Sequence, residues 1–251
     1  MLKRSTDFNE INDALNIKNI DGADLFDIHY ALKIRSYLNA YGAERDFCGF
    51  YITENGNGCA LAVNSLMVFY GDFCDIPELV SFISLHKPAR VELPKKYAED
   101  IAGYAKIRRT MYKFPKIFSD SFGAGVNREP NLDGVYEILA EGFPNIMQYE
   151  LWLADTSHRI RHGVSKFFTY REATAAAILY DINGHVQIGQ VATKTDARGQ
   201  GLAKHLLFSL GAELFAQGKT PVLYALDIRR DFYENLGFIE VGTDSVMIDN
   251  G

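Results

Sequence analysis

The sequence has few cysteines and no long apolar run. Cys48, Cys59 and Cys74 are the three cysteines in 251 residues, and their spacing matches no metal site. An odd number of cysteines without such spacing predicts buried free thiols in a reducing compartment. Nowhere do about 18 apolar residues follow one another, the length that a membrane-spanning helix needs, and the N-terminus lacks the apolar stretch of a signal peptide. We therefore predict a cytoplasmic protein with no membrane span.

An excess of positive charge is also absent. The formal net charge is -6, from 26 Lys and Arg against 32 Asp and Glu, and no dense basic tract occurs. Binding to a phosphate backbone depends on clustered Lys and Arg, so a nucleic-acid partner is not expected. A hydrophobic fraction of 47% and a charged fraction of 23% are those of a globular protein with a core. The length allows one large domain or two of about 120 residues.

Each half of the sequence contains a predicted β-hairpin. In the first half, residues 47–53 and 59–63 are rich in apolar, aromatic and β-branched residues, and the turn sequence Glu-Asn-Gly-Asn-Gly separates them. In the second half, Asn183-Gly184 separates predicted strands at residues 173–182 and 185–193. Asn-Gly favours a type I′ turn, because both central residues of that turn need positive φ.

Similar elements surround the two hairpins. Two helices are expected before each hairpin, and a helix and a strand after it. These predicted elements are residues 11–41 (two helices), 75–87 and 89–93 in the first half, and 132–143, 148–162, 201–216 and 221–226 in the second.

The repeated order predicts two lobes. Residues 119–130 contain two glycines and a proline and are expected to link a lobe of residues 1–118 to a lobe of residues 131–251. A hairpin that leads into a strand-helix-strand unit predicts a mixed sheet with helices on its faces. The expected fold class is therefore α/β (α+β), with a mixed central β-sheet flanked by helices in each lobe.

The segment with the clearest chemistry joins the second hairpin to the next helix. It reads Gln-Val-Ala-Thr-Lys-Thr-Asp-Ala-Arg-Gly-Gln-Gly-Leu-Ala over residues 190–203. Glycines let the backbone approach a ligand closely, and a new helix N-terminus offers unpaired N–H groups and a partial positive charge. This pattern predicts an anion site with a diphosphate as its natural occupant. It is not a P-loop, since no Gly-Lys-Ser/Thr follows, and a plain strand-to-helix turn is the structural alternative.

A second motif follows the next predicted strand. It reads Asp-Phe-Tyr-Glu-Asn-Leu-Gly-Phe over residues 231–238 and is expected to be a short helix that ends at Gly237. An Arg-Gly-x-Gly-Leu-Ala segment followed by Phe-Tyr-Glu-x-Leu-Gly-Phe resembles the GNAT N-acetyltransferase superfamily, over roughly residues 132–249. The resemblance implies a GNAT lobe that uses acetyl-CoA as co-substrate, with no metal. The first half is then expected to be a degenerate GNAT-like lobe.

The resemblance implies roles for individual residues. The strand before the loop would pair with the pantetheine arm through its backbone, and the loop and helix start would hold the pyrophosphate. The residues implied in cofactor binding are Val191, Ala192, Thr193, Arg198, Gly199, Gln200, Gly201, Leu202, Ala203 and Lys204. Tyr233 matches the tyrosine that acts as general acid toward the departing CoA thiolate, and a phenol with a pKa near 10 suits a thiolate of similar basicity in a dry site. The alternative for Tyr233 is a core residue with a satisfied hydroxyl.

The sequence departs from the family pattern at three points. Asp196 stands before the loop where a Gln or Arg is usual. The Asn commonly found before the tyrosine helix has no match, and Asp227, the nearest residue, would only cap that helix. Gln187 lies near the position where some members carry a glutamate base, and its amide cannot take a proton. The base is then a water relay, another residue, or none, if the amine arrives deprotonated.

Two histidines precede the second hairpin. His158 and His162 are four residues apart, but no Glu lies between them in the zincin pattern and no third ligand is evident, so no metal is predicted. GNAT folds usually line the acceptor pocket in this region. His158, Arg161 and His162, together with Arg159, are therefore candidates for binding an acidic group on the acceptor. A solvated or salt-bridged helix end is the alternative.

The first half lacks a matching phosphate loop. After its strand it reads Tyr-Gly-Asp-Phe-Cys-Asp-Ile-Pro over residues 70–77, with one glycine. Asp72 and Asp75 stand where a pyrophosphate would lie and would repel it, and Pro77 removes an N–H donor from the helix start. We predict that this lobe binds no CoA and instead walls the acceptor pocket.

The sequence therefore predicts an enzyme, an acetyl-CoA-dependent N-acetyltransferase. It would move an acetyl group to the amine of a small molecule or peptide by direct transfer in a ternary complex, since the cysteines lie outside the second half and an acyl-cysteine route has little support. The alternative is a non-catalytic acyl-CoA-binding or sensor module, favoured by the missing base and the missing Asn. Aminoacyl transfer from charged tRNA is opposed by the Gly-rich loop and the acidic net charge. Monomer and homodimer both stay open.

Overall fold

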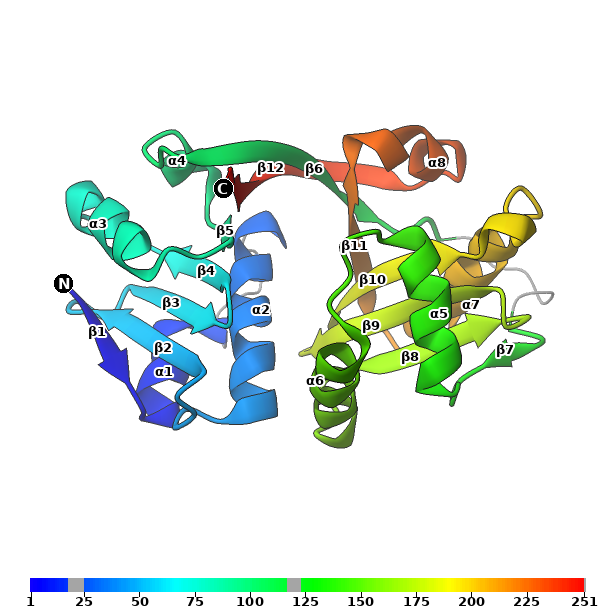
Figure 1. The fold of residues 1–251 in the computed structure, drawn as a ribbon, viewed down its shortest axis with the longest axis horizontal. Coiled ribbons are helices and arrows are strands. Elements are labelled where there is room, and N and C mark those ends of the chain that lie inside the picture. Colours follow the sequence, from blue (N-terminus) through cyan, green and yellow to red (C-terminus); the bar gives the residue numbers. More distant parts are fainter. Residues whose placement is uncertain (18–24, 117–122, 251) are drawn as a thin grey trace. The chain divides into compact units, whose positions relative to one another are not determined.

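The same order of elements occurs twice along the chain in the computed structural model, which describes residues 1–17, 25–116 and 123–250. Each repeat consists of a strand, two helices, three strands, a helix, a strand, a helix and a strand (Figure 1). The first repeat comprises β1 (Leu2–Ser5), α1 (Phe8–Ala14), α2 (Leu25–Tyr41), β2 (Cys48–Thr53), β3 (Gly58–Val63), β4 (Leu66–Gly71), α3 (Ile76–His86), β5 (Arg90–Glu92), α4 (Lys95–Ala98) and β6 (Tyr104–Lys113). The second comprises β7 (Val126–Asn127), α5 (Leu132–Gly142), α6 (Tyr149–Arg161), β8 (Lys166–Tyr170), β9 (Thr174–Ile182), β10 (His185–Thr193), α7 (Leu202–Ala216), β11 (Thr220–Leu226), α8 (Arg230–Asn235) and β12 (Ile239–Asp249).

The last strand of each repeat runs from one compact unit into the other. The first unit contains residues 1–110 and 241–251, and the second contains residues 111–240. In the first unit β12 follows β5 in the strand order, and in the second β6 follows β11. The units therefore differ from the predicted lobes of residues 1–118 and 131–251. The predicted linker, 119–130, lies partly outside the described residues, and its described part contains β7.

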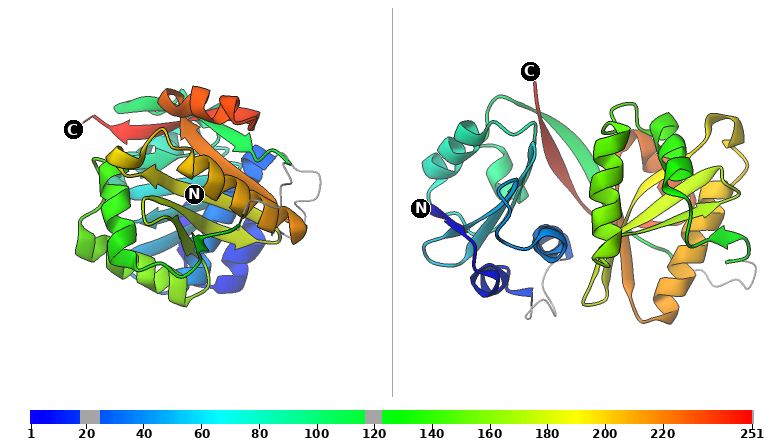
Figure 2. Two further views of the ribbon diagram at one scale, coloured as in Figure 1. Left: turned by 90° about the vertical axis from the view of Figure 1, so that its right-hand side faces the viewer. Right: turned by 60° about the horizontal axis from the view of Figure 1, so that its bottom comes forward.

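The first unit has a mixed sheet covered on both faces. Strands β1 to β4 are antiparallel, β4 and β5 are parallel, and β12 is antiparallel to β5. Helices α1 and α2, seen end-on in the right view of Figure 2, lie beside these strands, while α3 packs Leu79 and Ile83 into a core with Met67 and Phe69. Asp75 caps α3 with its side chain, and Lys87 ends it in a left-handed conformation, which confirms the predicted helix.

The second unit has the same layered arrangement. Strands β7 to β10 are antiparallel, and β10 and β11 are parallel. Helices α5 and α6 lie in front of β8–β10 in Figure 1, and α7 lies behind them. The apolar side chains of α7 are buried in the core on that side. Asn183 and Gly184 have φ of 51° and 79°, as the predicted type I′ turn requires.

Two strands beside the hairpins were missed. β4 stands between the first predicted hairpin and α3, and β8 precedes the second hairpin. By element order the counterpart of the β9–β10 hairpin is therefore β3–β4, rather than the predicted hairpin of residues 47–63. The segment of residues 70–77 is still the counterpart of the glycine loop, because each joins the third of three consecutive strands to a helix.

The remaining general predictions concern the thiols and the membrane. Cys48 and Cys59 are buried free thiols, and burial raises the pKa of Cys59 to about 12. Cys74 is a free thiol as well, but it is exposed, so its predicted burial was wrong. Within the described part of the chain, no helix combines the length and apolarity needed to cross a bilayer.

Candidate cofactor and catalytic site

The strands β10 and β11 part in the middle of their length. Residues 185–188 of β10 pair in parallel with residues 220–223 of β11. Beyond them, β10 continues to Thr193 and β11 to Leu226 with no further register pair in the described ranges. The strand before the glycine loop therefore separates from its neighbour β11 over its last residues.

A bulge in β10 accompanies this separation. The register between β9 and β10 shifts between Gly189 and Ala192, and Gln190, inside the shift, has φ of 50°. A left-handed conformation costs a non-glycine residue about 1–2 kcal/mol, and such residues gather at functional sites. The Oε1 atom of Gln190 is also buried and has no hydrogen-bond partner among the described residues. Gln190 begins the segment of residues 190–203, but the sequence predicted no role for it, because neither its backbone angle nor its missing partner can be read from residue types.

The bulge determines which backbone groups of β10 point away from β9, toward the side where β10 separates from β11. The N–H of Lys194 donates to Ala173 O at 2.8 Å, on the β9 side. Backbone groups alternate in direction along a strand, so those of Val191 and Thr193 point away from β9, while Ala192 faces it and accepts from Thr174 Oγ1 at 2.7 Å. The edge of β10 that would pair with a pantetheine arm is thus formed by Val191 and Thr193.

The glycine loop presents a run of unpaired backbone donors. Gly199 and Gly201 have φ of 77° and 74°, and Gly201 is the N-cap of α7 without any side-chain cap bond. From Gly199 to Lys204, no backbone N–H has a hydrogen-bond partner within the described residues. The first N–H groups of a helix lack internal partners and bind anions readily. These are the donors that the predicted diphosphate site requires.

The C-terminal turn of α5 holds the loop in place. Glu141 Oε2 accepts from the backbone N–H of Thr195 at 2.6 Å. Arg198 donates from Nε to Thr193 O at 3.1 Å and from Nη2 to Glu141 O at 3.2 Å. An added Cβ on Gly142 would lie 2.6 Å from the Cβ of Ala192, so α5 approaches β10 closely here. The Arg198 guanidinium therefore folds back onto the backbone of the loop and of α5, and its predicted part in cofactor binding stays a prediction.

Tyr233 lies on α8, at the point where the chain turns from β11 toward β12. Gly237 N–H donates to Glu234 O at 2.9 Å, and Phe238 N–H donates to Tyr233 O at 3.1 Å. This pair of bonds is a Schellman motif, with Gly237 at φ of 82° as predicted for the helix end. Asp227 does not cap α8, since it lies in a 3-10 turn and the N-cap, Arg229, makes no side-chain bond.

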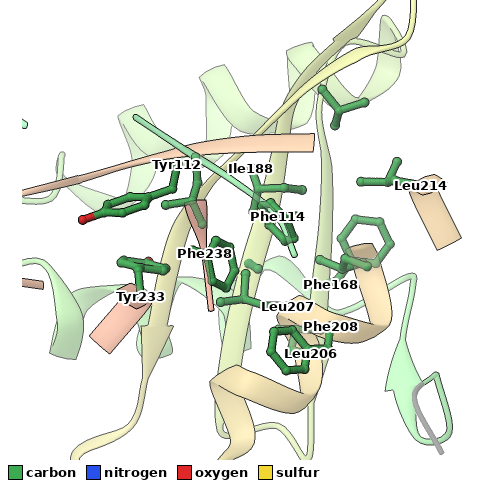
Figure 3. Close-up of a cluster of buried hydrophobic side chains, with 14 of the residues drawn as sticks. Tyr112, Phe114, Phe168, Ile188, Leu206, Leu207, Phe208, Leu214, Tyr233 and Phe238 are labelled. Carbon is green, nitrogen blue, oxygen red and sulfur yellow. The ribbon is translucent and has the colours of Figure 1, made fainter. Parts of the chain in front are cut away.

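The Tyr233 side chain belongs to the core of the second unit, and its hydroxyl has no partner among the described residues. It is 7% exposed and packs in the aromatic and aliphatic cluster of Figure 3. Burial raises the pKa of Tyr233 to about 12. No residue in the described ranges forms a hydrogen bond with its hydroxyl, and this oxygen is not one of the fully buried side-chain atoms that lack a partner. Tyr233 is thus a core residue whose hydroxyl stays available to water or a ligand, and its role as general acid stays a prediction.

The corresponding tyrosine of the first unit has a hydroxyl that is hydrogen-bonded within its own unit. Tyr97 lies on α4, the counterpart of α8. Its hydroxyl accepts from the backbone N–H of Phe73 at 2.9 Å and lies 3.3 Å from Asp72 Oδ1, and Phe73 is itself buried. Asp72 also pairs with Lys96. The loop that corresponds to the glycine loop is thus filled by side chains of its own unit.

A backbone donor at the start of α3 is likewise bonded by a side chain of the first unit. Asp75 Oδ1 accepts from the backbone N–H of Glu78 at 2.8 Å. A cavity of about 220 Å³ beside this helix start is lined by four carboxylates, those of Glu54, Asp72, Asp75 and Glu78. A diphosphate would meet acidic groups here instead of free N–H donors.

The predicted acceptor residues lie at the end of α6. The rings of His158 and His162 stack at 4.1 Å, and His162 Nδ1 lies 2.8 Å from His158 O. Arg161 is exposed, whereas Arg159 is buried and donates from Nη2 to Leu179 O at 3.2 Å, so Arg159 has a structural role. His158, Arg161 and His162 stay predictions for acceptor binding. Across residues 1–17, 25–116 and 123–250, no group of three or more His, Cys, Asp or Glu could hold a metal.

Comparison with known proteins agrees with this geometry. A family model described as an acetyltransferase (GNAT) domain matches residues 127–251. Among curated proteins, none matches the sequence. Several solved structures of GNAT proteins are similar over nearly the whole chain, which places both repeats within one fold.

Three of these structures illustrate the similarity. A GNAT-family acetyltransferase from Colwellia psychrerythraea is 16% identical, with 99% of each chain covered and a TM-score of 0.58. A GCN5-related N-acetyltransferase from Sphaerobacter thermophilus is 15% identical, with 98% of this chain and 94% of that chain covered and a TM-score of 0.61. A GCN5-related N-acetyltransferase-like protein from Streptococcus suis is 14% identical, with 95% and 99% covered and a TM-score of 0.56. At this identity they show the fold, and the family model adds the membership: residues 127–251 of this chain belong to the GNAT acetyltransferase family.

Proposed function

We propose that this protein transfers an acetyl group from acetyl-CoA to an amine, with the donor bound in the second unit and Tyr233 as general acid. The observation that carries the proposal is the run of unpaired N–H groups from Gly199 to Lys204, placed directly after the parted strand β10. These donors would hold the diphosphate of CoA. The outward edge of Val191 and Thr193 would hold the pantetheine arm, which leads toward the separation of β10 from β11.

The proposed chemistry needs one proton donor from the protein. The acceptor nitrogen attacks the thioester carbonyl carbon, the carbon–sulfur bond then breaks, and the Tyr233 hydroxyl gives its proton to the departing sulfur. The nitrogen loses one proton to solvent as the amide forms, and a proton from solvent restores the Tyr233 phenol. This hydroxyl is protonated at neutral pH, and its pKa of about 12 makes it a weaker acid than the phenol with a pKa near 10 that the sequence predicts. Gln187, near the position of the glutamate base in some relatives, is buried between Tyr180 and Val222 in the sheet and cannot accept a proton. The acceptor is therefore proposed to arrive as the free amine.

A thiol-release assay tests the activity. Acetyl-CoA is incubated with the protein and a panel of primary amines (a polyamine, an amino sugar, an α-amino acid, an arylalkylamine and a peptide N-terminus), and free CoA thiol is measured. We expect release with at least one amine, and a fall in kcat of about 10²-fold or more for Tyr233→Phe. Binding of acetyl-CoA without thiol release would favour the sensor alternative, and an unchanged kcat in Tyr233→Phe would refute the assigned acid.

We further propose that each chain binds one CoA. In the first unit the Tyr97 hydroxyl and Asp75 already occupy backbone donors of the loop and of the start of α3, and the lining of the adjacent cavity is acidic. Calorimetric titration with CoA is expected to give one equivalent per chain, and two equivalents would contradict the proposal.

A further inference from the structure

The first repeat of the sequence contributes a side chain to the surroundings of Tyr233. β6 ends the first repeat, but its last residues, from Met111 on, belong to the second unit. There the fully buried Tyr112 stacks on Tyr233, with the ring centroids 5.8 Å apart and the planes at 26° (Figure 3). We propose that Tyr112 is a positioning residue for Tyr233, so that the first repeat takes part in the chemistry of the second. This inference rests on the proposed role of Tyr233 as general acid.

Tyr233 needs a support from outside its own segment. α8 has six residues, and its N-cap makes no side-chain bond. Isolated helices of this length are unstable, so tertiary contacts must fix the orientation of the ring. Two of its ring contacts, with Phe232 at 5.0 Å and Phe238 at 5.3 Å, come from the same short segment. Among the described residues, the ring contact from elsewhere in the chain is the one with Tyr112.

Tyr112 also contacts the neighbouring residue of the same helix. Its hydroxyl donates to Glu234 Oε1 at 3.3 Å, and Glu234 is the residue that follows Tyr233. One side chain of β6 therefore contacts the proposed acid through its ring and the neighbouring residue of α8 through its hydroxyl. Both contacts restrict the rotation of α8 about its axis, which would move the Tyr233 hydroxyl.

The position of the Tyr233 hydroxyl depends on how its ring is packed. In the first unit the Tyr97 hydroxyl accepts a backbone hydrogen bond, which helps to fix its position. The Tyr233 hydroxyl has no hydrogen-bond partner in the described part of the chain, which leaves it available to a ligand. Its position then depends on the contacts of the ring, and reacting groups must be held closely for efficient transfer. The stacked face provided by Tyr112 is one of the three ring contacts that Tyr233 makes in the described residues.

The test compares three variants of the full chain, with acetyl-CoA and the amine of the panel that gives the fastest thiol release. Tyr112→Leu removes the stacked ring, and Tyr112→Phe keeps the ring but removes the hydroxyl. Phe114→Leu is the matched control, because Phe114 is also buried near the end of β6 and contacts Phe238 but makes no ring contact with Tyr233 in the described residues. For each variant, kcat, the Kd of acetyl-CoA and the thermal midpoint are measured.

We expect Tyr112→Leu to lower kcat about tenfold, because the aromatic pair is lost and Tyr233 is held less firmly. The Kd of acetyl-CoA should stay unchanged. Tyr112→Phe should recover most of the rate. Phe114→Leu should lower the thermal midpoint to a similar extent but keep its kcat. An equal loss of kcat in Phe114→Leu, or a weaker Kd in Tyr112→Leu, would assign Tyr112 a general structural role and overturn the proposal.

A double-mutant comparison separates this inference from the proposed function. If Tyr112 acts through Tyr233, adding Tyr112→Leu to Tyr233→Phe should cost no further rate. A further tenfold loss in that background would overturn the positioning role alone. An unchanged rate in Tyr233→Phe by itself would instead refute the assigned acid, and with it the reason for positioning that side chain.

Discussion

Two glycines at opposite ends of α7 allow the proposed diphosphate site to be tested with a matched pair of substitutions. Gly201 precedes the helix with φ of 74°, and Gly218 follows it with φ of 72°. A Cβ added at either position would meet no atom within 4 Å. Gly201→Ala and Gly218→Ala therefore share one cost, the left-handed conformation of an alanine, which is about 1–2 kcal/mol. For a chain of this size we expect each to lower the thermal midpoint by roughly 2–8 °C.

The two substitutions should differ in CoA binding. Gly201 lies within the run of unpaired N–H groups, whereas the N–H of Gly218 already donates to Phe215 O at 2.9 Å. Strain at Gly201 turns the neighbouring N–H groups away from their present directions. A hydrogen bond to a charged group contributes about 1.5–3 kcal/mol, and about 1.4 kcal/mol corresponds to a factor of ten in Kd. Losing one such bond to the diphosphate should thus raise the Kd of CoA at least tenfold.

Calorimetric titration with CoA, combined with thermal unfolding of the same samples, provides the measurement. We expect the Kd to rise at least tenfold in Gly201→Ala and to stay within about twofold of the wild-type value in Gly218→Ala, with similar losses of thermal midpoint. An unchanged Kd in Gly201→Ala would refute the assignment of the diphosphate to this helix start. Equal weakening in both variants would show that the loss comes from the stability of α7 and not from the site.

Three further predictions follow from other contacts. Glu141→Ala should weaken CoA binding three- to tenfold by calorimetry, because it releases the Thr195 N–H. Glu137→Ala, one turn earlier on α5, should leave CoA binding unchanged. Tighter binding in Glu141→Ala would mean that the negative charge of Glu141 affects CoA binding more than its hydrogen bond does. With Tyr233 at a pKa of about 12 and no base at Gln187, kcat/KM should rise with pH up to the pKa of the acceptor amine and not fall before about pH 10; a fall near neutral pH would contradict both assignments. Glu92→Gln should lower the free energy of unfolding, measured in urea, by about 3–5 kcal/mol, because Glu92 is fully buried among Lys33, Arg90 and Arg109.

Glu92 also predicts how the free energy of unfolding changes as the pH falls. The surrounding cations hold the pKa of Glu92 well below its usual range, against the effect of burial. A carboxyl with a depressed pKa contributes its full stability above the unfolded-state pKa of about 4.3, and this contribution is lost as the pH falls toward the folded-state value. Urea unfolding between pH 5 and pH 2 should therefore show a steeper loss of stability in the wild type than in Glu92→Gln. Equal slopes would contradict the assignment.

Local signals predicted the elements that carry the site. The Asn183-Gly184 turn, the start of α7 after Gly201 and the end of α8 at Gly237 were all predicted from the sequence, because glycine and asparagine in left-handed conformations determine these boundaries. β8 was missed because the turn that follows it uses Arg171 and Glu172, with φ of 53° and 50°, and neither residue type signals such a turn.

Features that depend on tertiary packing could not be predicted. The bulge at Gln190 changes the face of the following residues, but an alternating apolar pattern can be drawn through β10 with or without it. The bonds of Glu141 to Thr195, and of Arg198 to Thr193 and Glu141, join segments that no motif relates. The bond between the Tyr97 hydroxyl and the loop of the first unit could not be predicted either, since only the folded position of α4 brings this hydroxyl to the loop.

The exchange of the last strands gives a physical reason why the first repeat matters although its own loop is filled. β6 brings Tyr112 into the second unit, where it stacks on Tyr233. In return, β12 brings Asp244 into the first unit, where its buried carboxylate accepts from Tyr30 at 2.6 Å and from Arg109 at 2.7 Å. Each unit therefore takes a buried aromatic or ionic contact from the other repeat. A repeat that has lost its phosphate loop can still be required by the other, because the strand that it supplies contacts the residue proposed to donate the proton.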